Sequence, residues 1–157
     1  MRIYFSMPDE LMLLDSMDRM NALHARLEDF LTSYARLIRF EADRWGTPVP
    51  YDLLLAGLEV HKGQGPALLS VTDSGWLQLA GSAHNLRRYV SNFSFEQDDC
   101  YHYPENPVLD EYIARDSLGL IVEVCSEWVQ ELEASRLSEH RVFSTPRPAR
   151  AGVILAG

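Results

Sequence analysis

The stretch from Phe95 to Pro107, FEQDDCYHYPENP, gathers several side chains that could do chemistry. It holds carboxylates, an imidazole, a thiol and two phenols. Carboxylates with an imidazole can bind a divalent metal ion, and a thiol near an imidazole can act as a nucleophile. Tyrosines among carboxylates suit recognition of a basic protein. Three kinds of site therefore compete for this stretch.

A metal site here would centre on His102 and Glu105, with Asp98, Asp99 and Cys100 nearby in the sequence. Ligands must converge in space and need supporting hydrogen bonds, and closeness along the chain does not ensure this. The other histidines show no HExxH or H-x-H spacing. We therefore expect no cofactor and no metal, and keep a small metal-dependent enzyme as an alternative.

A nucleophile pair would join Cys100 to His102. On an extended stretch the two side chains point in the same direction, but contact between them is not ensured. The acids around the thiol should raise its pKa, which opposes activation. The serine motif G-x-S-x-G is absent, and KGQGP is a poor phosphate loop because Pro66 lacks an amide proton. We therefore expect no catalytic residue and no enzyme.

Negative charge is concentrated in one part of the chain. Eleven acids and one base, Arg115, lie between Glu96 and Glu133, which gives this segment a charge of −10 in a chain of −9. Such a field repels nucleic acid and anionic membranes and attracts basic partners. A solvated acidic face that only aids solubility is the alternative.

A basic protein partner is thus the ligand we expect, with no nucleic acid and no membrane. Pro104 and Pro107 stiffen the stretch, which lowers the entropic cost of docking its aromatic rings. The expected contact residues are Asp98, Asp99, Tyr101, His102, Tyr103 and Glu105.

The elements around this stretch predict an α+β fold with a mainly antiparallel sheet. A first strand at residues 2–6 precedes a cluster of helix-start residues, Ser6 to Glu10, and a long amphipathic helix that runs to Tyr34. Further strands are expected at residues 38–42 and 58–61, a hairpin at 67–81 and a buried strand at 117–124. Short helices are expected at residues 51–56, after Ser82, and after Ser126, the last with Trp128, Leu132 and Leu137 as its anchors.

The composition predicts a single domain over residues 1–157 and a cytoplasmic protein. The N-terminus lacks the apolar region of a signal peptide, and Cys100 and Cys125 have no pairing motif. The long helix and the VIL run at residues 153–155 offer apolar surface that a homodimer could cover. An oligomeric accessory domain is therefore another alternative.

Three segments together resemble a known class of proteins. ALLSVTDSGWLQLAGSAHNL, YHYPE and YIARDSLGLIVEVCSEW, within residues 67–128, are similar to small bacterial immunity-type proteins found beside polymorphic toxins. The resemblance implies an α+β protein that binds and neutralises a cognate toxin and has no activity of its own. Tyrosines stand here where that class would have further histidines, which weakens a metal role.

Overall fold

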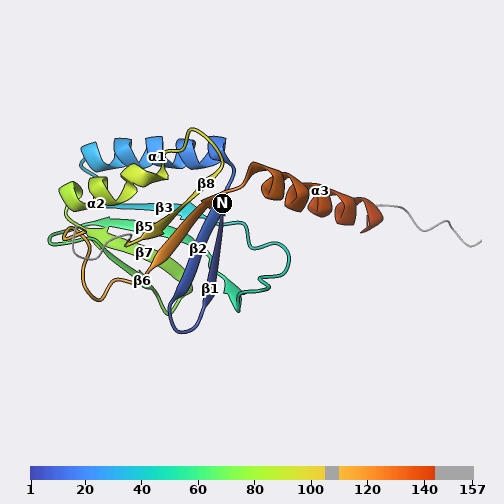
Figure 1. The fold of residues 1–157 in the computed structure, drawn as a ribbon, viewed down its shortest axis with the longest axis horizontal. Helices are drawn as coiled ribbons and strands as arrows, with labels where there is room; N and C mark the ends of the chain where they lie inside the picture. Colours follow the sequence, from blue (N-terminus) through green and yellow to red (C-terminus); the bar gives the residue numbers. More distant parts are fainter. Residues whose placement is uncertain (105–109, 144–157) are drawn as a thin grey trace, which may run out of the picture.

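The chain forms an α+β structure with two mixed β-sheets and three α-helices (Figure 1). The computed structural model describes the backbone of residues 1–104 and 110–143 and the side chains of these residues as far as residue 138. Most neighbouring strands are antiparallel, as predicted, and the pairs β2–β9 and β5–β7 are parallel. Across these residues no helix is long and apolar enough to span a bilayer.

Sheet A joins the N-terminal hairpin to strands from the acidic segment. Its order is β4 (Leu53–Leu54), β1 (Arg2–Ser6), β2 (Glu10–Asp15), β9 (Leu120–Val124) and β8 (Asp99–Tyr103). The predicted buried strand is thus confirmed as β9, which pairs with β2 on one side and β8 on the other. The edge strand β8 lies in the middle of the stretch singled out from the sequence.

Sheet B is built from the middle of the chain. Its order is β3 (Leu37–Glu41), β5 (Gly57–Lys62), β7 (Trp76–Gly81) and β6 (Leu68–Val71). The predicted hairpin is confirmed as β6–β7. Its turn places Gly75 at a φ of +77°, which glycine adopts without steric cost.

The helices complete two separate apolar clusters. The main core takes side chains from both sheets, from α1 (Met17–Thr32), from α2 (Ala83–Val90) and from the short 3-10 helix η1 (Ser91–Phe93). Ser82 caps α2 as predicted, because its side chain accepts a hydrogen bond from the Asn85 amide. In Figure 1 α1 and α2 lie together on one side of the molecule.

The third helix, α3 (Ser126–Phe143), covers part of the other face of sheet A and projects beyond it (Figure 1). Trp128, Val129 and Leu132 pack against a second cluster formed by Tyr4, Met12 and Leu14. We call the face of sheet A that carries Tyr4, Met12 and Leu14 the outer face of sheet A. Trp128 and Leu132 are thus confirmed as anchors, whereas Leu137 is 64% exposed and anchors nothing.

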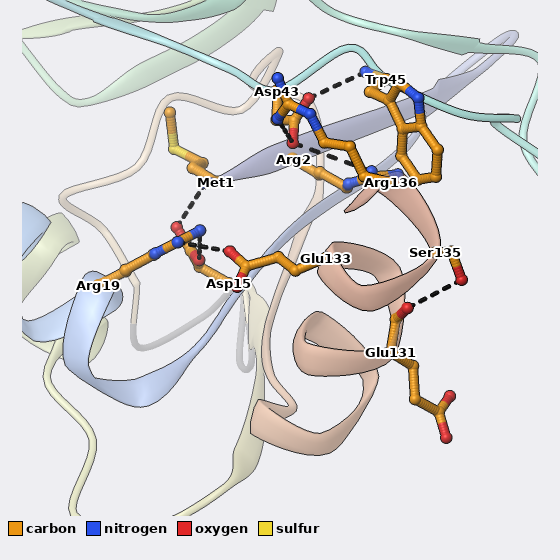
Figure 2. A network of polar contacts seen from close by, with 10 residues as sticks. All are labelled: Met1, Arg2, Asp15, Arg19, Asp43, Trp45, Glu131, Glu133, Ser135 and Arg136. Atoms are coloured by element: carbon orange, nitrogen blue, oxygen red, sulfur yellow. Dashed lines mark hydrogen bonds and ion pairs between the residues drawn. The ribbon is translucent and has the colours of Figure 1, made fainter. Parts of the chain in front are cut away.

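Ion pairs also hold α3 against the body (Figure 2). Arg19 Nη2 lies 2.5 Å from Glu133 Oε1, and Arg136 Nη1 lies 3.2 Å from Asp43 Oδ2. All four side chains are at least partly exposed, so each pair is screened by solvent and contributes little alone.

The long N-terminal helix predicted from Ser6 onward is wrong. Residues 7–9 turn the chain from β1 into β2, and α1 begins only at Met17. The apolar residues of β2 gave no strand alternation because both faces are buried: Leu11 and Leu13 lie in the main core, and Met12 and Leu14 in the second cluster. The inward stripe of α1 is otherwise present, except that Tyr34 lies beyond the helix and is fully exposed.

The short helix predicted at residues 51–56 is also wrong. Leu53 and Leu54 form β4, and the Leu55 amide donates a hydrogen bond to the Ile3 carbonyl. The VIL run at residues 153–155 lies outside the described residues.

Candidate functional site

Tyr103 is a core residue and not a surface contact, which corrects the sequence-based assignment. It is 4% exposed, and its hydroxyl donates a 2.6 Å hydrogen bond to the Tyr89 carbonyl. Its ring stacks on the Tyr89 ring with centroids 4.3 Å apart. Side chains alternate along a strand, and Tyr103 falls on the inward face of β8. Very little of its surface is therefore available to a partner.

Asp98 has a structural role that the sequence did not reveal. Its carboxylate accepts hydrogen bonds from the Ser126 amide and from the Ser126 hydroxyl, both 2.8 Å long. A carboxylate at a helix N-terminus satisfies a free amide and complements the helix dipole. Asp98 therefore fixes the start of α3.

The other predicted contact residues divide by exposure. Asp99 and His102 are exposed. Tyr101 is half-buried, and its ring lies edge-on to that of Tyr103 with centroids 4.7 Å apart. Glu105 lies outside the described residues. Fewer of the predicted contact residues are therefore exposed to a partner than the sequence indicated.

Cys100 and His102 are brought together, with 3.4 Å between Sγ and Nε2. Burial raises the pKa of the Cys100 thiol, and the charges of Glu123 and Asp99 raise it further. The predicted direction of this pKa shift is thus confirmed, and the thiol stays protonated at neutral pH. Within residues 1–104 and 110–138, no group of three His, Cys, Asp or Glu side chains is placed to hold a metal ion.

Strand pairing brings distant segments together on the outer face of sheet A. Ile121 lies opposite His102 on β8 and beside Met12 on β2. Glu123 lies opposite Cys100 in the same way. Paired residues point to the same face of a sheet, so these side chains form one continuous surface.

A groove of about 470 Å³ opens on this surface, and we call it the sheet A groove. Leu11, Gly119, Leu120 and Ile121 supply apolar and backbone lining. The remaining lining residues are Asp9, Glu10, Tyr51, His102 and Tyr103. Among the described residues, the lining thus includes two carboxylates and neither a lysine nor an arginine.

Tyr51 forms one wall of the groove. Its hydroxyl lies 3.5 Å from the Met12 sulfur, and its ring centroid lies 5.3 Å from that of Tyr4. Burial raises the pKa of the Tyr51 phenol, and the charges of Glu10 and Glu123 add to the increase. The groove is therefore a negatively charged environment that favours a cation.

We call Asp9, Glu10, Asp99 and Glu123 the acidic face. Asp9 and Glu10 line the groove, and the charge of Glu123 raises the pKa of Tyr51 and of Cys100. Asp99 begins β8 opposite Val124, and its charge raises the pKa of the adjacent Cys100. The sequence placed Asp9 and Glu10 at the start of a helix, so they and Tyr51 were missed as site residues. Only the pairing of β2 with β9 brings them near β8. Glu123 lies in the acidic segment of the sequence. Its position between Val122 and Val124 indicates that its side chain points to the opposite face of the strand from the two valines, and this pattern could have identified it.

A second polar cluster lies on the surface of sheet B that faces away from the main core. The Glu59 side chain is 6% exposed, and its carboxylate lies 3.0 Å from Arg39 Nε, 2.7 Å from Gln78 Nε2 and 3.1 Å from His61 Nε2. Burial favours a higher pKa, but these hydrogen bonds outweigh it and hold the pKa of Glu59 below its usual 4.5. All three neighbours hydrogen-bond the carboxylate, which gives the cluster a structural role.

Comparisons of the chain with protein-family models, with curated proteins and with solved structures found no match.

Proposed function

We propose that this protein is a non-catalytic binding protein of the immunity type, which neutralises a toxic protein by binding a basic surface on it. The acidic face and His102 form the proposed contact surface. The resemblance within residues 67–128 supports the immunity class, and the charges around the sheet A groove support a basic partner.

One observation carries the binding proposal. Two carboxylates, Asp9 and Glu10, line a partly apolar groove whose described lining includes no lysine or arginine, and the charges of Glu123 and Asp99 act on Tyr51 and Cys100 nearby. Uncompensated charge of one sign speeds the encounter with a partner of opposite charge, while apolar contacts slow its release. The arrangement therefore suits a protein that must capture its partner quickly.

A charge-matched pair of variants tests this proposal. Asp99→Asn with Glu123→Gln removes two charges from the acidic face, and Asp29→Asn with Glu41→Gln removes two exposed charges elsewhere. A partner is first isolated from the native host, then purified and its binding rates are measured at low and high salt. We expect the acidic-face variant to associate more slowly and with a weaker salt dependence, and the control to match the parent.

Equal association rates for both double variants would contradict the acidic face as the contact surface. The immunity assignment has a separate test, in which the partner is expressed in cells with and without this protein. We expect the partner alone to arrest growth and the pair to grow. A harmless partner would remove the immunity assignment and leave the binding surface intact.

A further inference from the structure

We infer that the sheet A groove holds an arginine side chain of the partner. This inference rests on the proposed function, because it names the chemical group that the acidic face would receive. An arginine has a long apolar stem and a planar cationic end with five N–H donors. The groove offers a matching surface to each part.

The floor of the groove suits the apolar stem. Ile121 is half-buried beside Met12, and Leu120, the first residue of β9, and Gly119 before it also line the groove. A Cβ at Gly119 would lie 3.2 Å from the Tyr103 carbonyl oxygen, so strands β8 and β9 approach each other closely at this end of the groove. A methylene stem lying on this floor would be removed from water while its charged end stays at the rim.

The rim suits the guanidinium group. Asp9 and Glu10 are exposed carboxylates at the turn between β1 and β2, on the rim of the groove. Two neighbouring carboxylates can accept hydrogen bonds from separate N–H groups of one guanidinium, which are stronger than hydrogen bonds between neutral groups. Glu123 adds negative charge near Tyr51 without lining the groove.

The aromatic wall favours arginine over lysine. Tyr51 is partly exposed and lines the groove, so a planar group can lie against its ring. A guanidinium stacks on aromatic rings and is more weakly hydrated than an ammonium group. The volume of about 470 Å³ leaves room for the broad end of an arginine.

Small probes test this inference without the partner. N-acetyl-arginine amide is titrated into the full chain while amide NMR signals are followed, and N-acetyl-citrulline amide serves as a neutral probe of almost the same shape. N-acetyl-lysine amide is the third probe. We expect the arginine probe to shift the amides of Glu10, Tyr51, His102 and Ile121 in a saturable way, the lysine probe to bind more weakly, and the citrulline probe to leave these signals unchanged.

Variants then assign the binding to the groove. Glu10→Gln and Tyr51→Leu should each weaken binding of the arginine probe by roughly fivefold or more, while Asp29→Asn should leave it unchanged. Glu10 is exposed, so its variant should fold like the parent. Shifts scattered over the surface, equal binding of lysine and arginine probes, or parent-like binding by Glu10→Gln would each overturn the inference.

The outcome can be separated from that of the proposed function. The arginine probe could fail to bind while the partner still loses affinity for the Asp99→Asn, Glu123→Gln variant. That result would support the acidic face as the contact surface and refute the arginine site. If the probe binds the groove but the partner ignores the acidic face, the proposed contact surface falls instead.

Discussion

Individual side chains show how one residue type serves different purposes within a few positions. Tyr101 and Tyr103 are two residues apart on β8 and both face inward, yet Tyr103 is 4% exposed whereas Tyr101 is half-buried. Asp98 caps a helix, whereas the adjacent Asp99 is an exposed member of the acidic face. The composition of this stretch indicated a recognition site, but it could not distinguish the residues that stabilise the fold from those that are exposed to a partner.

Replacing Tyr103 with phenylalanine should destabilise the protein by about 1–2 kcal/mol, because the Tyr89 carbonyl would lose its hydrogen-bond donor inside the core. Tyr103→Ala should cost about 3–5 kcal/mol, since it also leaves a cavity. Urea denaturation monitored by circular dichroism measures both losses. A Tyr103→Ala variant as stable as the parent would mean that this ring is not part of the core.

Glu59 should make the stability of the protein depend on acid. Its pKa is lowered in the folded state, so its stabilising contribution is present above the unfolded value of 4.5 and is lost as the pH falls through the lowered folded pKa. At neutral pH we expect Glu59→Gln to be less stable than the parent by about 1–3 kcal/mol. This difference should shrink as the pH falls below 4.5.

Urea denaturation of both proteins at several pH values checks the Glu59 prediction. Glu41→Gln, an exposed change on the neighbouring strand β3, is the control and should follow the parent at every pH. If the difference in unfolding free energy between the parent and Glu59→Gln stays constant to the lowest pH measured, the pKa of this carboxylate is not lowered in the folded state.

The secondary-structure elements were predictable where local signals agreed with the final packing. The β6–β7 hairpin has a glycine turn between alternating strands, and α2 has a serine cap before a helical stripe. The start of α1 was misplaced because Pro8, Asp9 and Glu10 suit a helix N-terminus and a turn equally well. Burial on both faces of β2 removed the alternation that would have decided between them.

The site was less predictable than the fold. His102 and Asp99 come from the acidic segment, but Glu10 and Tyr51 reach the same groove only through the order of strands in sheet A. The parallel pairing of β2 with β9 joins segments about a hundred residues apart, and no local sequence pattern predicts such a long-range pairing.

The two faces of β9 should respond differently to a buried charge. Val122 is fully buried in the main core, so Val122→Asp should destabilise the fold by more than about 4 kcal/mol or prevent folding. Ile121 is half-buried at the edge of the second cluster, and Ile121→Asp should cost clearly less. Expression yield and urea midpoints provide the comparison, and a parent-like midpoint for Val122→Asp would refute the assignment of β9 to the core.

At the scale of the whole molecule, stability is divided unevenly between the two clusters. The main core draws on both sheets, α1 and α2, whereas the described side chains of α3 contribute to the small cluster on the outer face of sheet A, to exposed ion pairs and to the Asp98–Ser126 cap. Elements with fewer buried contacts open at a lower free energy than the core. The molecule should therefore lose α3 before it unfolds globally.

Native-state hydrogen exchange should show this order of opening. Amides of α3 are expected to exchange at a lower free energy of opening than those of β5 and β7. Asp98→Ala should lower the opening free energy of α3 by a further 0.5–2 kcal/mol or so, because it removes the cap at Ser126, while β7 should change little. Exchange of α3 at the same free energy as β7 would show that the helix is bound into the global fold.

The parallel pairing of β2 with β9 has a consequence during protein synthesis. The N-terminal hairpin leaves the ribosome early, but the strand that covers one side of β2 is translated only after about a hundred further residues. At ordinary translation rates that interval lasts several seconds, during which an apolar strand edge can pair with another nascent chain. Chaperone binding to stalled nascent chains should therefore be strongest before residue 124 has emerged and should decline once β9 can dock.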